Sequence, residues 1–323
     1  MEFTFLGTSA GTPTRARNVT GLALCLHGPK PWYLVDCGEA TQHQLLRTRY
    51  SVMQLRAIFI THNHGDHIFG LPGLLTSASM LGRSEPLDLV APAAVHRFVE
   101  AAIGNSDSSL SFPLNFIDSE GENVHWQDQN LRVTTTALSH RVPCRAFTFT
   151  ERRVERQLIQ EQLEADGVEA GPAWGRLQKG EDVLLDDGRL LLSDDYTRIC
   201  RAPRQIIVAG DNDSPELLAD ASRNSHVLIH EATYTRDIAD KVGHWPQHSC
   251  AEQVARFARQ AGLPNLVLTH FSSRYQSGPG GTPHINQIAA EALQHYRGQL
   301  FLARDLDTYQ LDRDFTLVKQ EAS

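Results

Sequence analysis

The chain has 323 residues and a formal charge of −8 at pH 7, because 38 acidic residues outweigh 30 lysine and arginine residues. This balance argues against bulk electrostatic attraction to a polyanion, although it does not exclude a local basic patch. Hydrophobic residues make up 41% of the chain without any repeat or low-complexity tract, which indicates a folded globular protein rather than a disordered one.

The first part of the chain predicts an antiparallel β region followed by alternating strands and helices. A short strand opens the chain, and two further strands are expected at residues 21–28 and 32–39. Residues 40–50 have helical periodicity, residues 55–61 form an apolar run typical of a buried strand, and residues 68–82 predict a helix after a proline break.

The second part of the chain contains β-rich runs that share one design, because each ends in residue types that bind metals. Helical stretches such as PELLADASR and SCAEQVARFARQAG lie between them, which indicates an α/β fold. In such folds, functional side chains gather on the loops at one edge of the sheet. The runs are LRVTTTALSH, APRQIIVAGDND, SHVLIHEAT and LPNLVLTH.

Residues 151–192 interrupt this pattern. Residues 151–167 predict a charged helix, residues 171–180 are rich in Gly, Pro and Trp, and DVLLDDGRLL carries an Asp-Gly hairpin signal. We therefore expect one catalytic domain over residues 1–323 with an arm-like insertion at 151–192. A lid that covers an open sheet edge is the alternative.

The segment THNHGDH at residues 61–67 is the strongest functional signal. Imidazole and carboxylate groups are the natural ligands of zinc and related cations. His62 and His64 alternate in an extended segment and would point the same way, whereas Gly65 lets the chain turn so that Asp66 and His67 face a second position. One loop would therefore serve two metal ions.

Three strand ends supply the remaining ligands that a two-metal hydrolytic site needs. They are His140, Asp211 and His270, and the short anionic side chain of Asp211 suits a bridge between two cations. Asp213 is assigned to local structure, because it precedes a helix start with Ser214 at the cap.

The sequence also indicates in which cellular compartment the protein is expected. It contains no apolar run of membrane-spanning length, and its N-terminus lacks the features of a signal peptide, so we expect a cytoplasmic protein without a membrane partner. The cysteines show no C-x-x-C spacing, and we expect them to be reduced and mostly buried.

These motifs resemble the metallo-β-lactamase superfamily and, within it, the ribonuclease Z family, also called ribonuclease BN. The segments that carry the resemblance run through nearly the whole chain: FLGTSAGTPTRARNVT, DCGEATQHQLL, FITHNHGDHIFGLPGLL, HEAT, HSC and LTHFSSRY. The resemblance implies a four-layer αββα sandwich with a projecting arm. It also implies an endoribonuclease that removes the 3′ trailer from precursor tRNA and leaves a 3′-hydroxyl.

The resemblance further implies two divalent metal ions per subunit, with zinc expected and manganese or iron as alternatives. A hydroxide that bridges the ions would attack the phosphorus, and Asp66 would accept a proton. One ion would be held by His62, His64 and His140, the other by Asp66, His67 and His270, with Asp211 as the bridge.

The leaving 3′ oxygen needs a proton, and Glu231 with His248 suits this role. A carboxylate can orient an imidazole and raise its pKa, so that the imidazole acts as general acid. The alternative is that both residues only form hydrogen bonds at strand ends. His230 is assigned to structure, because its side chain opposes that of Glu231 along a strand.

The insertion is similar to the family's flexible arm, which grips the tRNA elbow. Its residues Arg152, Arg153, Arg156, Arg176 and Lys179 would contact phosphates. However, residues 150–167 lack the Gly/Pro-rich stretch usual in the arm's tip. A homodimer, in which one subunit's arm serves its partner's active site, is implied by the family.

Two other functions remain open. A small-molecule metallohydrolase of the same superfamily would cleave a lactone, thioester or sulfate ester and would have no use for Glu231 and His248 as an acid pair. A nucleic-acid-binding protein with a purely structural metal site would need a closed, four-coordinate site, whereas seven ligands for two ions leave room for water.

Overall fold

The computed structural model describes residues 1–26, 28–121, 124–278 and 280–321. They form two compact units. The main unit comprises Met1–Asp128, Arg132–Thr150 and Arg204–Ser323, and the insertion unit comprises Gln129–Leu131 and Glu151–Pro203. Position 27, at the end of the strand expected over residues 21–28, lies outside the described residues.

The first sheet of the main unit combines antiparallel and parallel strands. Its antiparallel part holds β21, β20, β1, β3 and β4, and its parallel part continues from β4 through β5 and β6 to β7. In sheet order the strands are β21 (Leu317–Lys319), β20 (Thr308–Leu311), β1 (Glu2–Gly7), β3 (Gly21–Cys25), β4 (Trp32–Cys37), β5 (Leu55–Phe59), β6 (Leu87–Ala91) and β7 (Leu114–Asp118).

The second sheet comes mostly from the second half of the chain. Strands β15, β16, β17 and β19 are parallel, whereas β10 pairs antiparallel with β15, and β8 pairs antiparallel with β9. In sheet order the strands are β19 (Gln299–Leu302), β17 (Asn265–Thr269), β16 (Val227–Glu231), β15 (Gln205–Ala209), β10 (Cys144–Glu151), β9 (Leu131–Leu138) and β8 (His125–Gln127).

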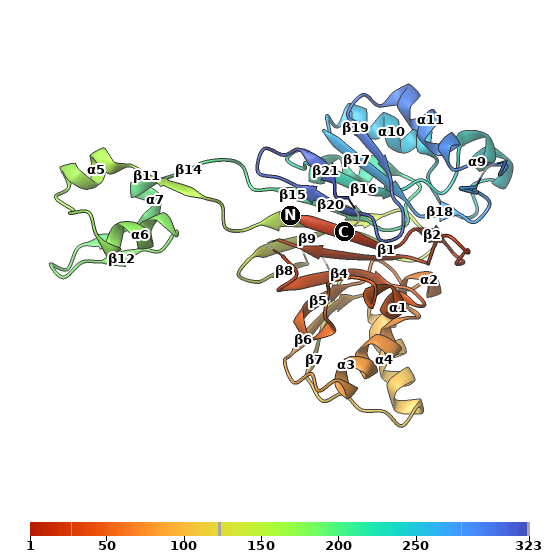
Figure 1. Ribbon diagram of the computed structural model, residues 1–323, viewed down its shortest axis with the longest axis horizontal. Coiled ribbons are helices and arrows are strands. Elements are labelled where there is room, and N and C mark those ends of the chain that lie inside the picture. Colours follow the sequence, from red (N-terminus) through yellow and green to blue (C-terminus); the bar gives the residue numbers. More distant parts are fainter. Residues whose placement is uncertain (27, 122–123, 279, 322–323) are drawn as a thin grey trace. The chain divides into compact units, whose positions relative to one another are not determined.

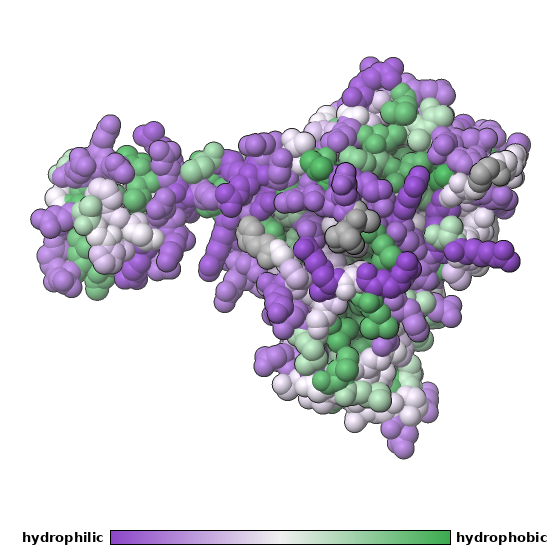
Figure 2. All heavy atoms as spheres, viewed as in Figure 1, coloured by the Kyte–Doolittle hydropathy of each residue, from purple (hydrophilic) through white to green (hydrophobic). Residues whose placement is uncertain are grey.

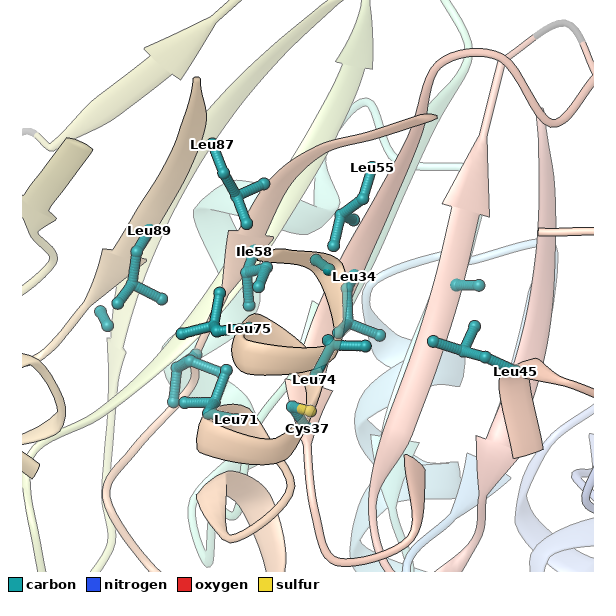
Figure 3. Packing of buried hydrophobic residues seen from close by; sticks show 14 of the residues in the cluster. Leu34, Cys37, Leu45, Leu55, Ile58, Leu71, Leu74, Leu75, Leu87 and Leu89 are labelled. Atoms are coloured by element: carbon teal, nitrogen blue, oxygen red, sulfur yellow. The ribbon is translucent and has the colours of Figure 1, made fainter. Parts of the chain in front are cut away.

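Helices cover the outer face of each sheet (Figure 1). Helices α3 (Leu71–Met80) and α4 (Ala93–Asn105) pack on the first sheet, and α10 (Ala251–Gln260) and α11 (Asn286–His295) pack on the second. On α3, the buried residues Leu71, Leu74 and Leu75 follow the helical spacing and face sheet residues such as Ile58 (Figure 3).

Aromatic side chains fill the space between the two sheets. Phe59 of β5 follows Ile58 and points to the opposite face, where its ring lies 5.3 Å from that of Phe147 and 5.2 Å from that of Phe149, both on β10. Trp126 of β8 packs on the same ring at 5.3 Å. The layers are therefore helix, sheet, sheet and helix, which confirms the expected αββα sandwich.

The remaining elements of the main unit are short and lie in the connections between the longer strands and helices. They are β2 (Ser9–Ala10), α1 (Thr41–Leu45), η1 (Val52–Gln54), α2 (Gly65–Ile68), η2 (Pro215–Leu218), α8 (Ala219–Ser222), α9 (Arg236–Val242) and β18 (Phe271–Ser272).

The surface is mostly polar. Hydrophilic residues predominate on the face shown in Figure 2, as the composition predicts. No helix formed by the described residues is long and apolar enough to cross a membrane.

The insertion unit has a small hydrophobic core of its own. Leu163, Val168, Leu177, Val183 and Leu191 are buried together in it. Its elements are β11 (Arg156–Leu158), α5 (Gln160–Ala165), α6 (Pro172–Gln178), β12 (Val183–Leu184), β13 (Leu190–Leu191), α7 (Ser193–Tyr196) and β14 (Thr197–Ile199).

Two local predictions for this unit have different outcomes. The Asp-Gly hairpin is confirmed, because β12 and β13 pair antiparallel around Gly188, which has a φ of 86°. The helix expected over residues 151–167 is wrong in its first half, where β11 pairs with β14. A strand partner some forty residues away in the sequence overrides the local helical pattern there. The compact unit also continues beyond residue 192, to Pro203.

Candidate metal centre

The loop after β5 delivers four polar side chains to one place. The backbone stays extended as far as His64, which has a φ of −67° and a ψ of 149°, and α2 begins at the next residue. This change from extended to helical backbone turns the chain between His64 and Asp66, and the imidazoles on both sides of the turn stay close together. The rings of His62 and His64 lie 4.7 Å apart, and those of His62 and His67 lie 4.1 Å apart.

Three strand ends of the second sheet converge on this loop. His140 follows β9, Asp211 follows β15 and His270 follows β17. A tight approach at Gly210 brings the end of β15 against the loop: a Cβ there would lie 2.6 Å from Thr61 Cβ and 2.6 Å from the sulfur of Cys144. Only glycine leaves room for this contact, which places Asp211 between the two sheets.

The seven predicted ligand side chains form two groups that meet at Asp211, and Asp211 and His270 also lie close enough to His248 to form a third possible ligand set. The ligand atoms of His62, His64, His140 and Asp211 lie within 4.8 Å of one another, as do those of Asp66, His67 and His270. Asp211 Oδ2 lies 3.6 Å from His62 Nε2 and 3.7 Å from His140 Nε2. Its Oδ1 lies 3.5 Å from His67 Nε2 and 3.4 Å from His270 Nε2. One carboxylate therefore turns an oxygen to each group.

The donor atoms fit a bound cation. The Nε2 atom of His67 is buried and has no hydrogen-bond partner among the described residues, a costly state that a metal ion would relieve. Burial lowers the pKa of His67, but the carboxylates of Asp66, Asp36 and Asp211 outweigh it and raise the pKa to about 10. Such an excess of negative charge around one imidazole attracts positive charge.

The three imidazoles of the first group are also suited to bind a cation. Burial lowers the pKa of His62, His64 and His140, which favours the neutral imidazoles that bind metals. His64 Nδ1 lies 3.1 Å from His62 Nε2 and 3.1 Å from His140 Nε2. Converging nitrogen lone pairs on neutral rings are the ligand set that zinc prefers.

The second ring nitrogen of most of these histidines has its own partner. His140 Nδ1 lies 3.0 Å from the carbonyl oxygen of Gln247, and His270 Nδ1 lies 3.2 Å from Thr233 Oγ1. His67 Nδ1 lies 2.8 Å from Asp36 Oδ2. Partners of this kind fix the orientation of metal-binding imidazoles and raise their basicity.

Asp36 is a site residue that the sequence reasoning missed. It lies near the end of β4 with a φ of 58°, and it also accepts hydrogen bonds from the Thr61 amide at 2.8 Å and the Thr61 hydroxyl at 2.9 Å. A left-handed conformation is uncommon for a non-glycine residue and marks a constrained position. The sequence feature that could have identified Asp36 is its position in DCGE, near the end of a predicted strand and shortly before a glycine.

Replacing Asp36 with asparagine is expected to weaken metal binding about 10- to 100-fold, the usual cost of losing a partner of a ligand histidine. The amide cannot hold the His67 imidazole by a charge-assisted hydrogen bond. Metal affinity measured by competition with a chelator checks this. Asp88→Asn is a matched control, since Asp88 is a buried carboxylate of β6 that pairs with Arg56. An equal loss of affinity in both variants would contradict the assignment.

Glu231 and His248 form a hydrogen-bonded pair beside Asp211. Glu231 ends β16 and is buried, and its Oε1 lies 2.9 Å from His248 Nδ1 and accepts the Asn212 amide at 2.8 Å. Thr233 Oγ1 donates to its other oxygen. Burial lowers the pKa of His248, but Glu231 outweighs it and raises that pKa to about 9. The hydrogen bond to Glu231 therefore favours the protonated form of the His248 imidazole.

His230 and Asp213 lie in hydrogen-bonded environments outside the two groups. His230 Nδ1 donates to the carbonyl oxygen of Glu231 at 2.7 Å, and burial lowers the pKa of its imidazole. Asp213 accepts a hydrogen bond from the Ser214 hydroxyl at 2.9 Å. That contact differs from the expected helix cap, because the Ser214 side chain makes no capping hydrogen bond.

An open pocket of about 350 Å³ gives access to the centre. Asp66, Asp211, His248 and His270 line it, so both groups and the acid pair face the same space. Gly11 closes one side and donates its amide to Asp66 Oδ2 at 2.7 Å.

The predicted phosphate-binding residues lie in the insertion unit and are exposed there. They are Arg152, Arg153, Arg176 and Lys179. Arg176 pairs with Glu181 at 3.2 Å, and Arg156, the further basic residue of this segment, pairs with Asp194.

A two-sheet sandwich with such a cluster at its strand ends defines a protein of the metallo-β-lactamase fold. The structure of the metallo-β-lactamase fold protein YhfI from Bacillus subtilis matches it with a TM-score of 0.65 over 95% of this chain and 98% of that one, at 18% identity. Ribonuclease Z from Marinobacter nauticus is 76% identical over 319 residues, 99% of each chain. The chain belongs to the ribonuclease Z family.

A second solved structure and a family model also match the chain. The structure of human tRNase Z, short form, is similar with a TM-score of 0.66 and 25% identity, and the match covers 97% of this chain and 100% of that one. The family model described as anti-Pycsar protein Apyc1 matches residues 1–142.

Proposed function

We infer that this protein is a metal-dependent endoribonuclease that removes the 3′ trailer from precursor tRNA and leaves a 3′-hydroxyl on the tRNA. The observation that carries this inference is the identity of 76% to a ribonuclease Z over 99% of both chains. The cluster of seven histidine and aspartate side chains supplies the chemistry that such a hydrolase needs.

We propose that the two groups hold two divalent ions, with zinc as the expected metal. His62, His64 and His140 would hold one ion, Asp66, His67 and His270 the other, and Asp211 would touch both. Neutral imidazoles with carboxylates suit zinc, and also manganese or iron. Bound there, the ions would lower the pKa of water and stabilise charge on the attacking and leaving oxygens.

Asp66 has a second task in this proposal, as the acceptor of the proton that the attacking water loses. Burial raises the pKa of Asp66, but His67 and His270 outweigh it and hold the pKa well below its usual range, so the carboxylate is ionised. Its Oδ2 is oriented by the Gly11 amide at 2.7 Å and faces the pocket where the phosphodiester would lie.

His248 would protonate the leaving 3′ oxygen of the tRNA. Its Nδ1 is engaged by Glu231, which leaves Nε2 to carry the transferable proton, and the residue lines the pocket. Glu231 is itself fixed by the Asn212 amide and the Thr233 hydroxyl, so the imidazole is held in one orientation. Glu231 is thus a positioning residue for the acid.

The insertion unit would bind the body of the tRNA. We propose that Arg152, Arg153, Arg176 and Lys179 contact phosphates there. The double variant Arg153→Glu, Lys179→Glu is expected to lower kcat/KM for precursor tRNA about tenfold and to flatten its salt dependence, because lost phosphate contacts release fewer counterions.

The measurement for this prediction compares precursor tRNA with a small phosphodiester over a range of salt. Hydrolysis of the small substrate should be unchanged. Arg223→Glu serves as control, since Arg223 is an exposed cation of the main unit whose side chain pairs with Asp220. Equal losses in the control and the double variant would contradict a specific role of the insertion unit.

We also propose a cytoplasmic homodimer. Leu46 at the end of α1 and Met80 and Leu81 at the end of α3 are exposed to 80%, 88% and 67%, and a second copy of the chain would cover such apolar surface. Sedimentation equilibrium of the purified protein is expected to give twice the chain mass, and cell fractionation is expected to recover it with cytoplasmic markers. A monomer at micromolar concentration would contradict the dimer.

The experiment that tests the function compares substrates of different classes. Metal-loaded protein is incubated with a 3′-extended precursor tRNA and, separately, with a lactone, a thioester and a sulfate ester. Cleavage of the tRNA precursor is expected, with much slower turnover of the small esters. The reverse preference would support the small-molecule metallohydrolase instead.

A further inference from the structure

Phe69 is a large apolar side chain that the fold leaves in the mouth of the site. Its neighbours Ile68 and Leu71 are buried in the core of the first sheet, whereas Phe69 is 61% exposed. It lines the same pocket of about 350 Å³ as Asp66 and His248. A single exposed phenylalanine is ordinary on a surface, but one that borders the reactive groups presents an aromatic face to whatever binds there.

The Phe69 ring is held in place rather than left free. It packs against the ring of Phe98 on α4, with centroids 6.0 Å apart at an angle of 44°. Gly65 allows its position, because a Cβ on that residue would lie 2.2 Å from Phe69 Cε2. A flat apolar surface with a fixed orientation costs little entropy when a planar group stacks on it.

Arg141 supplies a cation at the same pocket. It follows His140 directly, it is exposed, and it lines the pocket together with Phe69. Within the part of the chain that the structure describes, no hydrogen bond or ion pair engages its guanidinium. A guanidinium and a planar apolar ring that line one pocket are a combination that binds nucleotides, with phosphate on the cation and base on the ring.

We propose that Phe69 and Arg141 form a subsite for the first nucleotide of the trailer, with the base stacked on Phe69 and the next phosphate on Arg141. This inference rests on the proposed function. The nucleotide on the tRNA side of the cut can continue the stack of the acceptor stem. The first trailer nucleotide has no such partner, and unstacked bases are those that aromatic side chains capture.

The test follows the logic of a double-mutant cycle, with one change in the protein and one change in the RNA. Phe69→Ala is assayed on a precursor tRNA and on the same precursor with an abasic first trailer nucleotide. On the intact RNA we expect kcat/KM to fall about tenfold, the scale of one lost stacking contact. On the abasic RNA we expect almost no further loss, because the stacking partner is already gone. Phe69→Leu should behave like Phe69→Ala. Phe69→Trp should lose as much kcat/KM as the unsubstituted protein when the first trailer base is removed.

Two control variants separate stacking at Phe69 from a general loss of activity. Trp245 is an 80% exposed aromatic residue on the segment that leads to His248, and Trp245→Ala should show no dependence on the abasic position. Arg141→Gln should make the plot of log kcat/KM against log salt concentration less steep, by the amount expected for about one lost phosphate contact. Equal losses for Phe69→Ala on both RNAs, no loss at all, or a base dependence that appears with Trp245→Ala instead would overturn the proposal. Cleavage of the intact precursor by the unsubstituted protein tests the proposed function separately.

Discussion

Replacing Asp211 with asparagine is expected to lower RNA cleavage by about a thousandfold or more and to reduce the bound metal. Its two oxygens lie 3.4 Å to 3.7 Å from the imidazole nitrogens of both groups, so one substitution removes charge from both. Metal ions contribute several kcal/mol of charge stabilisation in such hydrolases, and each factor of ten in rate corresponds to about 1.4 kcal/mol.

Asp213→Asn is the matched control, because it makes the same chemical change two residues away on the same loop. Asp213 contacts Ser214 and is not part of either group. Metal content is measured by elemental analysis and kcat by single-turnover cleavage. The expected result is near-normal values for Asp213→Asn. Equal effects of the two variants, or a fully active Asp211→Asn protein, would show that the cluster is not the reactive centre.

The second large effect is expected for His248→Ala. The loss of a general acid lowers kcat about 100- to 10,000-fold on RNA, whose leaving 3′ oxygen needs a proton. A phosphodiester with nitrophenyl leaving groups needs no such proton, so its hydrolysis should fall much less. Metal content should stay unchanged, because His248 acts through the substrate rather than through a ligand role.

His244→Ala controls for damage to the segment, since His244 is exposed and its side chain carries none of this machinery. It should be as active as the unsubstituted protein on both substrates. If His248→Ala lowered kcat by the same factor on RNA and on the nitrophenyl ester, then the role of His248 as general acid would be wrong. Its role would then be structural.

The clustering of His62, His64, Asp66 and His67 could be predicted because all four lie within THNHGDH, directly after an apolar run. Asp211 and His270 end runs that form parallel strands, and the ends of such strands meet at one sheet edge. The pairing of Asp36 with His67 could not be predicted in the same way. It depends on β4 lying beside β5, a long-range contact that single residues do not encode.

The insertion unit shows that long-range contacts limit prediction from the sequence in the same way. The Asp-Gly hairpin was predictable because its turn and both of its strands lie within about ten residues of one another. The helix expected over residues 151–167 failed because Arg156–Leu158 pairs with Thr197–Ile199 across the whole insertion. Local patterns therefore predicted the elements whose partners are near in sequence and failed where the partner is distant.

Mapping the RNA ends that the purified, metal-loaded protein makes tests tRNA 3′ processing most directly. A 3′-extended precursor tRNA and an unstructured RNA of equal length are incubated with the protein and with Asp211→Ala. We expect one cut next to the discriminator nucleotide of the tRNA, a 3′-hydroxyl at that end, an intact unstructured RNA, and no cut by the variant. Cuts scattered over both RNAs, or the same cut by the variant, would contradict it.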